Sequence, residues 1–166
     1  EATYRYSNFM FSAKTHNKLD DYITSFIQDP QKKMWVGTHN GLKCVDRTNN
    51  VEQYNLPLLA FENERGNIIT SLLLDRRGLL WVGTITHGLT LFNPKSKIFT
   101  SFRHNNDDST SISSNYVISL YEDNEGSIWV GTYSGLNKMT FLSPSTEQPQ
   151  ISFQRKFKTS GGFSSI

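Results

Sequence analysis

The chain repeats one short phrase three times, and this repeat constrains the fold more than any other feature of the sequence. The phrase Trp-Val-Gly-Thr begins at Trp35, Trp81 and Trp129, which are 46 and 48 residues apart. An Asp stands six residues before each Trp, a Ser ten residues before it and a β-branched residue twelve residues before it. These residues are Asp29, Asp75 and Asp123, then Ser25, Ser71 and Ser119, then Ile23, Ile69 and Val117. So many positions in register predict an array of three similar structural units.

Each unit has the residue pattern of four short antiparallel strands. In the first unit, residues 22–28 alternate β-branched and aromatic side chains, residues 29–33 have turn chemistry, and residues 34–38 form a second apolar run. The third strands are expected at 42–46, 89–93 and 136–141, and the fourth at 51–55, 98–103 and 151–157. Units of about 40 to 50 residues with four strands in series are typical of β-propeller blades.

The expected fold is therefore all-β, a propeller segment of three four-stranded antiparallel blades plus one strand of a preceding blade. We divide the chain into a last strand and link at 1–19, blades at 20–66, 67–114 and 115–158, and a flexible tail at 159–166. Propellers close with about four to eight blades. We therefore expect this segment to belong to a larger propeller or to be completed by a second chain as a homodimer.

The turn between the first and second strands carries a second repeated signal. Gly78 and Gly126 stand where a positive φ angle is expected, and Lys32 occupies the equivalent position in the first unit. A residue with a Cβ atom is disfavoured at positive φ. The sequence therefore predicts that the first unit has the most strained turn.

Composition excludes several classes of function. The chain has 17 Lys plus Arg against 15 Asp plus Glu, and this near balance argues against a nucleic-acid partner. No run approaches the ~20 apolar residues of a membrane span, so we expect no membrane insertion in this segment. The single Cys44 and four scattered His residues predict no metal site. The sequence contains no phosphate-binding loop and no nucleophile elbow, so we expect no cofactor and neither nucleotide nor acyl-transfer chemistry.

Residues common to all three units are best explained by a structural need that all units share. The tryptophans could stack on sugar rings, but packing between sheets is the simpler interpretation. The aspartates could be catalytic acids or metal ligands. Each stands at a turn, however, where an Asp side chain commonly accepts hydrogen bonds from the backbone amides. Neither set is therefore chosen as the functional site.

Function is expected where the three units differ in equivalent loops. The loops between the second and third strands span 38–41, 84–88 and 132–135, and in a propeller they share one face with the links between blades. The candidate ligand-binding residues on this face are His39, Asn40, Arg65, His87, Asn106, Asp108, Tyr116 and Tyr133. Aromatic rings beside amide and carboxylate groups suit a carbohydrate, which has apolar faces and hydroxyl edges.

Residues 69–84 and 117–136, with the Asn-, Asp- and Ser-rich link at 104–113, resemble two-component regulator propeller repeats, and the likeness spans roughly residues 20–145. Propellers of this family typically form the periplasmic sensor of hybrid two-component histidine kinases in Bacteroides-type bacteria that regulate polysaccharide use. The resemblance implies a non-catalytic sensor segment of an inner-membrane protein, which helps to recognise an oligosaccharide and to relay the signal.

Two other functions stay open at this point. A catalytic propeller would act on a polysaccharide through His, Tyr or Arg residues of a central channel, and it would release a product. A purely architectural propeller would organise dimerisation and bind no small ligand. A sensor differs from both because it binds a ligand without turnover.

Overall fold

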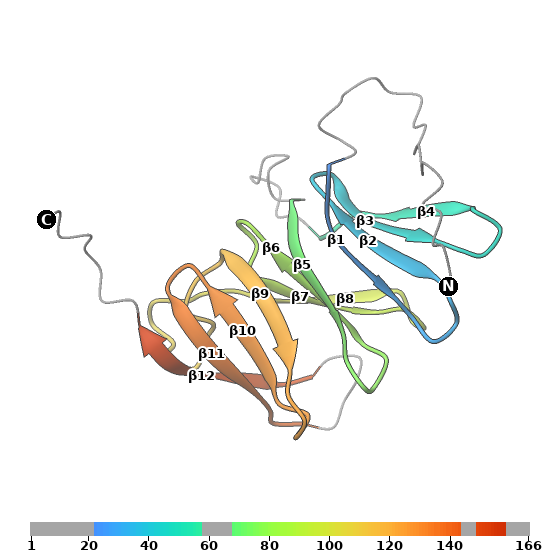
Figure 1. Ribbon diagram of the computed structural model, residues 1–166. Helices are drawn as coiled ribbons and strands as arrows, with labels where there is room; N and C mark the ends of the chain where they lie inside the picture. The colour runs from blue at the N-terminus through green and yellow to red at the C-terminus, as the bar shows by residue number, and fades with distance from the viewer. Residues whose placement is uncertain (1–21, 58–67, 144–148, 159–166) are drawn as a thin grey trace, which may run out of the picture.

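The structure is a computed structural model that describes residues 22–57, 68–143 and 149–158 of the 166-residue chain. Within these residues it consists of three four-stranded antiparallel sheets and contains no helix (Figure 1). The first sheet contains β1 (Ile23–Gln28), β2 (Met34–Thr38), β3 (Gly41–Val45) and β4 (Val51–Tyr54). The second contains β5 (Ile69–Leu74), β6 (Leu80–Thr84), β7 (Leu89–Asn93) and β8 (Ile98–Phe102). The third contains β9 (Val117–Glu122), β10 (Ile128–Thr132), β11 (Gly135–Phe141) and β12 (Ile151–Lys158).

This architecture confirms the predicted all-β propeller segment. In each sheet the strands lie side by side in chain order, and each strand is antiparallel to its neighbours. The expected strand at residues 4–12 and the expected tail at 159–166 lie outside the described residues, and the boundaries drawn between blades stay a prediction. No helix of the described ranges is long and apolar enough to cross a membrane.

The first strands of the three sheets lie next to one another, with β5 between β1 and β9 (Figure 1). A hydrogen bond ties two of these strands together, because the Thr70 hydroxyl donates to the carbonyl oxygen of Val117 over 2.6 Å. Each sheet thus has an inner edge at its first strand and an outer edge at its fourth strand, β4, β8 or β12. This arrangement is that of consecutive propeller blades.

Two apolar cores fill the spaces between neighbouring sheets. Trp35 is 2% exposed in the core between the first and second sheets, and Trp81 is fully buried in the core between the second and third. Each of these rings packs edge-on against a phenylalanine of the following sheet, Trp35 on Phe92 at 5.4 Å and Trp81 on Phe141 at 6.0 Å between ring centroids. The interpretation of these two tryptophans as core residues is confirmed.

The repeated aspartates cap the first turn of each sheet, as the sequence predicted. The Oδ1 atoms of Asp29, Asp75 and Asp123 accept the backbone amides of Lys33, Leu79 and Ser127 over 2.8, 3.0 and 2.8 Å. The Oδ2 atoms of the same residues accept the indole Nε1 of Trp35, Trp81 and Trp129 over 3.1, 3.0 and 2.8 Å. The bond to the indole explains the constant spacing of six residues between Asp and Trp, and no pattern in the sequence predicts it.

The turn glycines have the backbone conformation that the sequence predicted. Gly78 has a φ angle of 79° and Gly126 one of 84°. Lys32 adopts a φ angle of 66° at the same place, where its Cβ atom crowds the backbone. The first turn is therefore the strained one of the three.

Candidate functional site

At one end of the inner strands, the residue before each strand pairs with the loop that follows the second strand. The backbone amides of His39, Ile85 and Tyr133 donate to the carbonyl oxygens of Tyr22, Ile68 and Tyr116 over 3.0, 3.1 and 2.9 Å. This shared bond joins two residues at the same place on each blade. The pair is aromatic on the first and third blades and aliphatic on the second.

The third blade carries the most exposed of these pairs. The rings of Tyr116 and Tyr133 are parallel, with an interplanar angle of 1° and 6.1 Å between centroids. Tyr116 is 37% exposed and Tyr133 is 70% exposed. The structure therefore brings together two of the predicted site residues as an aromatic surface that faces solvent.

The first blade has a comparable pair that the sequence analysis found only in part. The ring of His39 stacks on Tyr22, with 5.3 Å between centroids and an interplanar angle of 25°. Tyr22 is 60% exposed. Its pattern predicts only a strand residue, but its place immediately before the β-branched residue matches that of Tyr116, and this equivalence is the sequence signal that indicates its role.

Asn40 follows His39 on the same loop and is half-buried. Its backbone amide donates to the Thr38 hydroxyl over 3.0 Å, and its carbonyl oxygen accepts the Gln53 side-chain amide over 3.2 Å. These bonds fix the loop that carries the His39 ring.

His87 lies below the surface rather than on it. Only 5% of the residue is exposed, its Nδ1 lies 2.8 Å from the Thr86 hydroxyl, and its backbone amide donates to the Thr84 hydroxyl over 2.9 Å. The loop of the second blade is one residue longer than its equivalents, and it turns this side chain inward. The structure does not group His87 with the exposed aromatic pairs.

Asn106 and Asp108 lie on the link between β8 and β9, and this link packs against the outer strand of the third sheet. The Arg155 guanidinium on β12 donates to the carbonyl oxygen of Asp108 over 3.3 Å. Asp108 also accepts the amide and hydroxyl of Thr110 over 2.8 and 2.6 Å. The Thr110 hydroxyl is the main cause that lowers the pKa of the Asp108 carboxyl. The side-chain oxygen Oδ1 of Asn106 accepts a hydrogen bond from Nε2 of the His104 ring over 3.0 Å.

The predicted residues therefore fall into two groups. His39 and Asn40 on the first blade, with Tyr116 and Tyr133 on the third, lie at the end of the inner strands. Asn106 and Asp108 belong to the link that contacts the outer edge of the third sheet. Arg65 lies outside the described residues.

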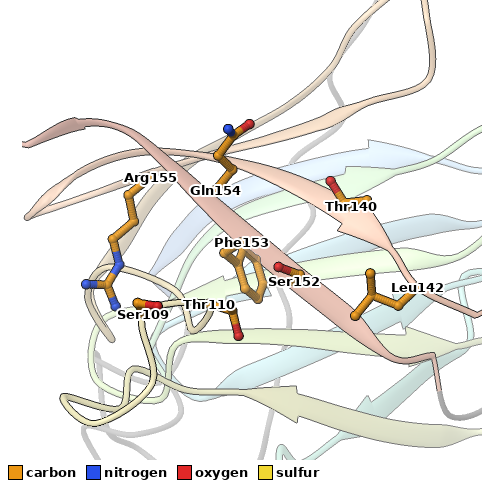
Figure 2. A pocket seen from close by; sticks show the side chains of 8 residues that line it. All are labelled: Ser109, Thr110, Thr140, Leu142, Ser152, Phe153, Gln154 and Arg155. Atoms are coloured by element: carbon orange, nitrogen blue, oxygen red, sulfur yellow. The ribbon is translucent and has the colours of Figure 1, made fainter.

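A shallow groove that the sequence analysis did not predict lies beside that link (Figure 2). Its lining residues are Ser109, Thr110, Thr140, Leu142, Ser152, Phe153, Gln154 and Arg155. Phe153 is only 4% exposed, and the Arg155 guanidinium already donates to the hydroxyl and carbonyl oxygens of Ser111 over 3.2 and 3.3 Å. The groove therefore has hydroxyl and amide groups but presents no free ring face to a ligand.

No metal-binding cluster of three His, Cys, Asp or Glu residues occurs in the part of the chain that the structure describes. Cys44 is buried, and burial raises the pKa of its thiol above the usual value. A buried thiol of this kind packs as a small apolar side chain.

Comparison with known proteins places these features in a family context. The family described as two component regulator propeller matches residues 17–40, 63–86 and 111–134. Histidine kinase P4 of Formosa agariphila is 34% identical over 152 residues, which are 87% of this chain and 11% of that protein.

Two solved structures are similar in fold. The extracellular domain of a hybrid two component system of B. thetaiotaomicron is 23% identical with a TM-score of 0.68, over 85% of this chain and 19% of that one. Virginiamycin B lyase of Staphylococcus aureus is 16% identical with a TM-score of 0.60, over 86% of this chain and 43% of the lyase. The chain thus spans less than half the length of each of these three proteins, and the likenesses to the two solved structures establish the fold alone.

Proposed function

Because the chain carries three two-component regulator propeller repeats, we propose that it is a non-catalytic, extracytoplasmic sensor segment of a hybrid two-component signalling protein and that it binds an oligosaccharide. The similarity to a histidine kinase and to the extracellular domain of a hybrid system supports this role. The chain covers a small share of both proteins, so kinase activity and its regulation of polysaccharide use belong to the proposal.

The observation that carries the ligand class is the pair of exposed aromatic stacks at the end of the inner strands. Tyr116 and Tyr133 on the third blade, and Tyr22 with His39 on the first, present ring surfaces to solvent. A pyranose ring has apolar C–H faces that pack on such surfaces, while its hydroxyl groups bond the phenol and imidazole edges. An oligosaccharide is long enough to contact more than one blade.

Signal relay follows from the stiffness of the blades. A sheet packed on both faces has no room to deform continuously, so a ligand acts by binding one arrangement of rigid parts better than another. A ligand that contacts two blades, or a blade and a neighbouring domain, has this differential affinity.

The decisive experiment measures binding of Tyr133→Ala to defined neutral and uronic-acid-containing oligosaccharides by isothermal titration calorimetry. We expect the affinity for the best oligosaccharide to fall at least tenfold, because one ring of the stack is lost. Tyr133→Phe keeps the ring and should stay within about threefold of the unchanged protein. Tyr121→Ala is the matched control, since Tyr121 is 61% exposed but lies on β9 away from the loop.

The outcomes separate the three functions. If the protein binds an oligosaccharide without forming a product, and Tyr133→Ala loses this binding, the sensor function is supported. A shortened or unsaturated oligosaccharide detected by mass spectrometry would replace it with the catalytic propeller. The absence of binding to any oligosaccharide of the panel would favour the architectural role.

A further inference from the structure

The outer edge of the third sheet is longer than those of the other two sheets. Its fourth strand, β12, has eight residues, whereas β4 has four and β8 has five. A strand at the edge of a sheet carries a row of unpaired backbone N–H and C=O groups, and a long edge is a template on which another chain can pair. Natural proteins keep such edges short, place charges on them or cover them with a loop.

Charged side chains protect only one half of β12. Arg155 and Lys156 lie in its second half, and Lys156 is exposed. The first half, residues 151–154, contains no charged residue, no Pro and no Gly. Nothing in the residue types of this half discourages pairing with another strand. The first half of β12 is therefore the part of the edge that needs a cover.

The link between β8 and β9 lies against this uncharged half of β12 (Figure 2). The backbone amide of Phe153 donates to the carbonyl oxygen of Thr110 over 2.8 Å, as it would to a neighbouring strand. Ser109 and Thr110 of the link, with residues 152–155 of the strand, line the shallow groove described above. The link thus occupies the place that a further strand would take beside β12.

Arg155 holds the link in this position. Its Nη2 donates to the carbonyl oxygens of Asp108 and Ser111 over 3.3 Å each, and to the Ser111 hydroxyl over 3.2 Å. Its Nε lies 3.4 Å from the same Ser111 carbonyl oxygen. A guanidinium group is planar and directs several N–H donors at once, so this one side chain bonds both ends of the segment that contains Thr110.

The link is also ordered by bonds of its own. Ser111 is 7% exposed, and its hydroxyl accepts the Asn105 amide over 3.0 Å and donates to the Asp108 carbonyl oxygen over 2.7 Å. The Asp108 carboxylate accepts the amide of Thr110 over 2.8 Å. These bonds keep the Thr110 carbonyl oxygen directed at β12, because they fix the residues on both sides of it.

We propose that residues 108–111 are a built-in cover for the outer edge of β12, which is held in place by Arg155 and prevents a second copy of this chain from pairing with that edge. In an antiparallel pair of two β12 strands centred on Phe153, Arg155 of one copy lies opposite Ile151 of the other, so like charges do not face each other. The edge is therefore self-complementary once the link is displaced. This proposal does not depend on any ligand.

The test measures amide hydrogen exchange by NMR at low protein concentration and self-association by sedimentation velocity, both on the 166-residue chain. In Arg155→Ala the Phe153 amide should exchange at least about tenfold faster, because the link loses the bonds that hold it against the strand. The same variant should self-associate at least about tenfold more tightly than the unchanged protein. Arg155→Lys should behave like Arg155→Ala, since an ammonium group keeps the charge but not the planar set of donors.

Two further variants separate loss of the cover from general destabilisation. Arg77→Ala is the matched control: Arg77 bonds Asp75 and lies over the Phe141 ring, so its loss weakens the fold but leaves the link in place, and self-association should not change. Adding Ser152→Lys and Gln154→Lys to Arg155→Ala should restore the unchanged behaviour, because these two positions face each other in the paired strands and like charges repel there.

Four results would overturn the proposal. The first is an unchanged exchange rate of the Phe153 amide in Arg155→Ala, and the second is faster exchange without tighter self-association. The third is unchanged self-association of Arg155→Lys, which would show that the positive charge alone keeps two copies apart. The fourth is self-association that Arg77→Ala reproduces or that the two added lysines do not reduce, since association would then not use the edge of β12.

Discussion

At the scale of the residue, one aspartate in each repeat links the first turn to the tryptophan of the second strand. Asp75 is 3% exposed and accepts hydrogen bonds from the Leu79 amide, the Trp81 indole and the Arg77 guanidinium, the last over 2.6 Å. Buried polar groups need such partners, so the carboxylate, the turn and the indole stabilise one another. The residue types and their spacing were visible in the sequence, but the bond between Asp and Trp was not, because it depends on how the turn folds back over the second strand.

Lys32→Gly is the residue-scale prediction. We expect the change to stabilise the protein by about 1 kcal/mol, because a left-handed backbone conformation is unfavourable for Lys but not for Gly. The φ angle of Lys32 is 66°, and its exposed side chain contributes little packing. Chemical denaturation monitored by tryptophan fluorescence measures the change. Lys32→Ala is the control and should give no gain, since it keeps the Cβ atom; an unchanged or lower stability of Lys32→Gly would contradict the strain.

At the scale of the element, the link between β8 and β9 is held by a buried side chain of the sheet that follows it. Asn137 on β11 is fully buried; its Nδ2 donates to the Ser113 hydroxyl over 2.8 Å and to the Val130 carbonyl over 3.1 Å, and its Oδ1 accepts the Ser113 amide over 3.0 Å. Ser113 also bonds the Thr132 hydroxyl over 2.8 Å. These bonds fix the link three residues before Tyr116. The position of the aromatic pair therefore depends on a residue that lies in a different strand.

Asn137→Ala should destabilise the protein by about 3 kcal/mol, since it removes the side-chain bonds to Ser113 and to the Val130 carbonyl and leaves the Ser113 amide without its acceptor. Thermal or denaturant unfolding measures this loss. Asn124→Ala is the matched control at an exposed turn and should change stability by less than about 0.5 kcal/mol. Equal effects of the two substitutions would show that the link is held by other contacts.

At the scale of the whole molecule, carboxylates with lowered pKa values are spread over the structure. The Thr48 hydroxyl is the main cause that lowers the pKa of Asp46 in the first sheet, and the Trp129 indole is the main cause for Asp123 in the third. Asp108 on the link between β8 and β9 is lowered by Thr110 in the same way. Each of these groups favours the folded state when it is ionised.

The free energy of unfolding should therefore fall as the pH drops below about 4, the ordinary range of an aspartate in an unfolded chain. The sign follows from the lowered folded pKa values: the stabilisation is complete above the unfolded pKa and is lost as the pH falls through the folded one. Denaturant unfolding at pH 7, 4 and 3 measures the slope. A triple variant with Asp46→Asn, Asp108→Asn and Asp123→Asn keeps one acceptor oxygen at each position and cannot titrate there. Its stability should therefore depend less steeply on pH, whatever its absolute value at pH 7; an unchanged slope would contradict the role of these three carboxylates.

The strands were predictable because the sequence has a strict long period and short-range alternation, and most observed strands begin and end within one or two residues of the expected positions. Glycine turns and Asp caps are equally local, so their chemistry is encoded in four or five consecutive residues. The candidate site was predictable only in part. Tyr116 and Tyr133 were named as members of one face, but nothing in their separation of 17 residues showed that their rings are parallel.

By itself the sequence determined the architecture of this protein: three repeats, four strands in each, and a residue type at every turn and core position. The tertiary structure decided which side chains meet. It stacked His39 on Tyr22, turned His87 into the interior and packed the link with Asn106 and Asp108 against the outer strand. The physical reason is that strand pairing depends on local pattern, whereas the side chains that share a surface depend on how successive sheets pack over one another.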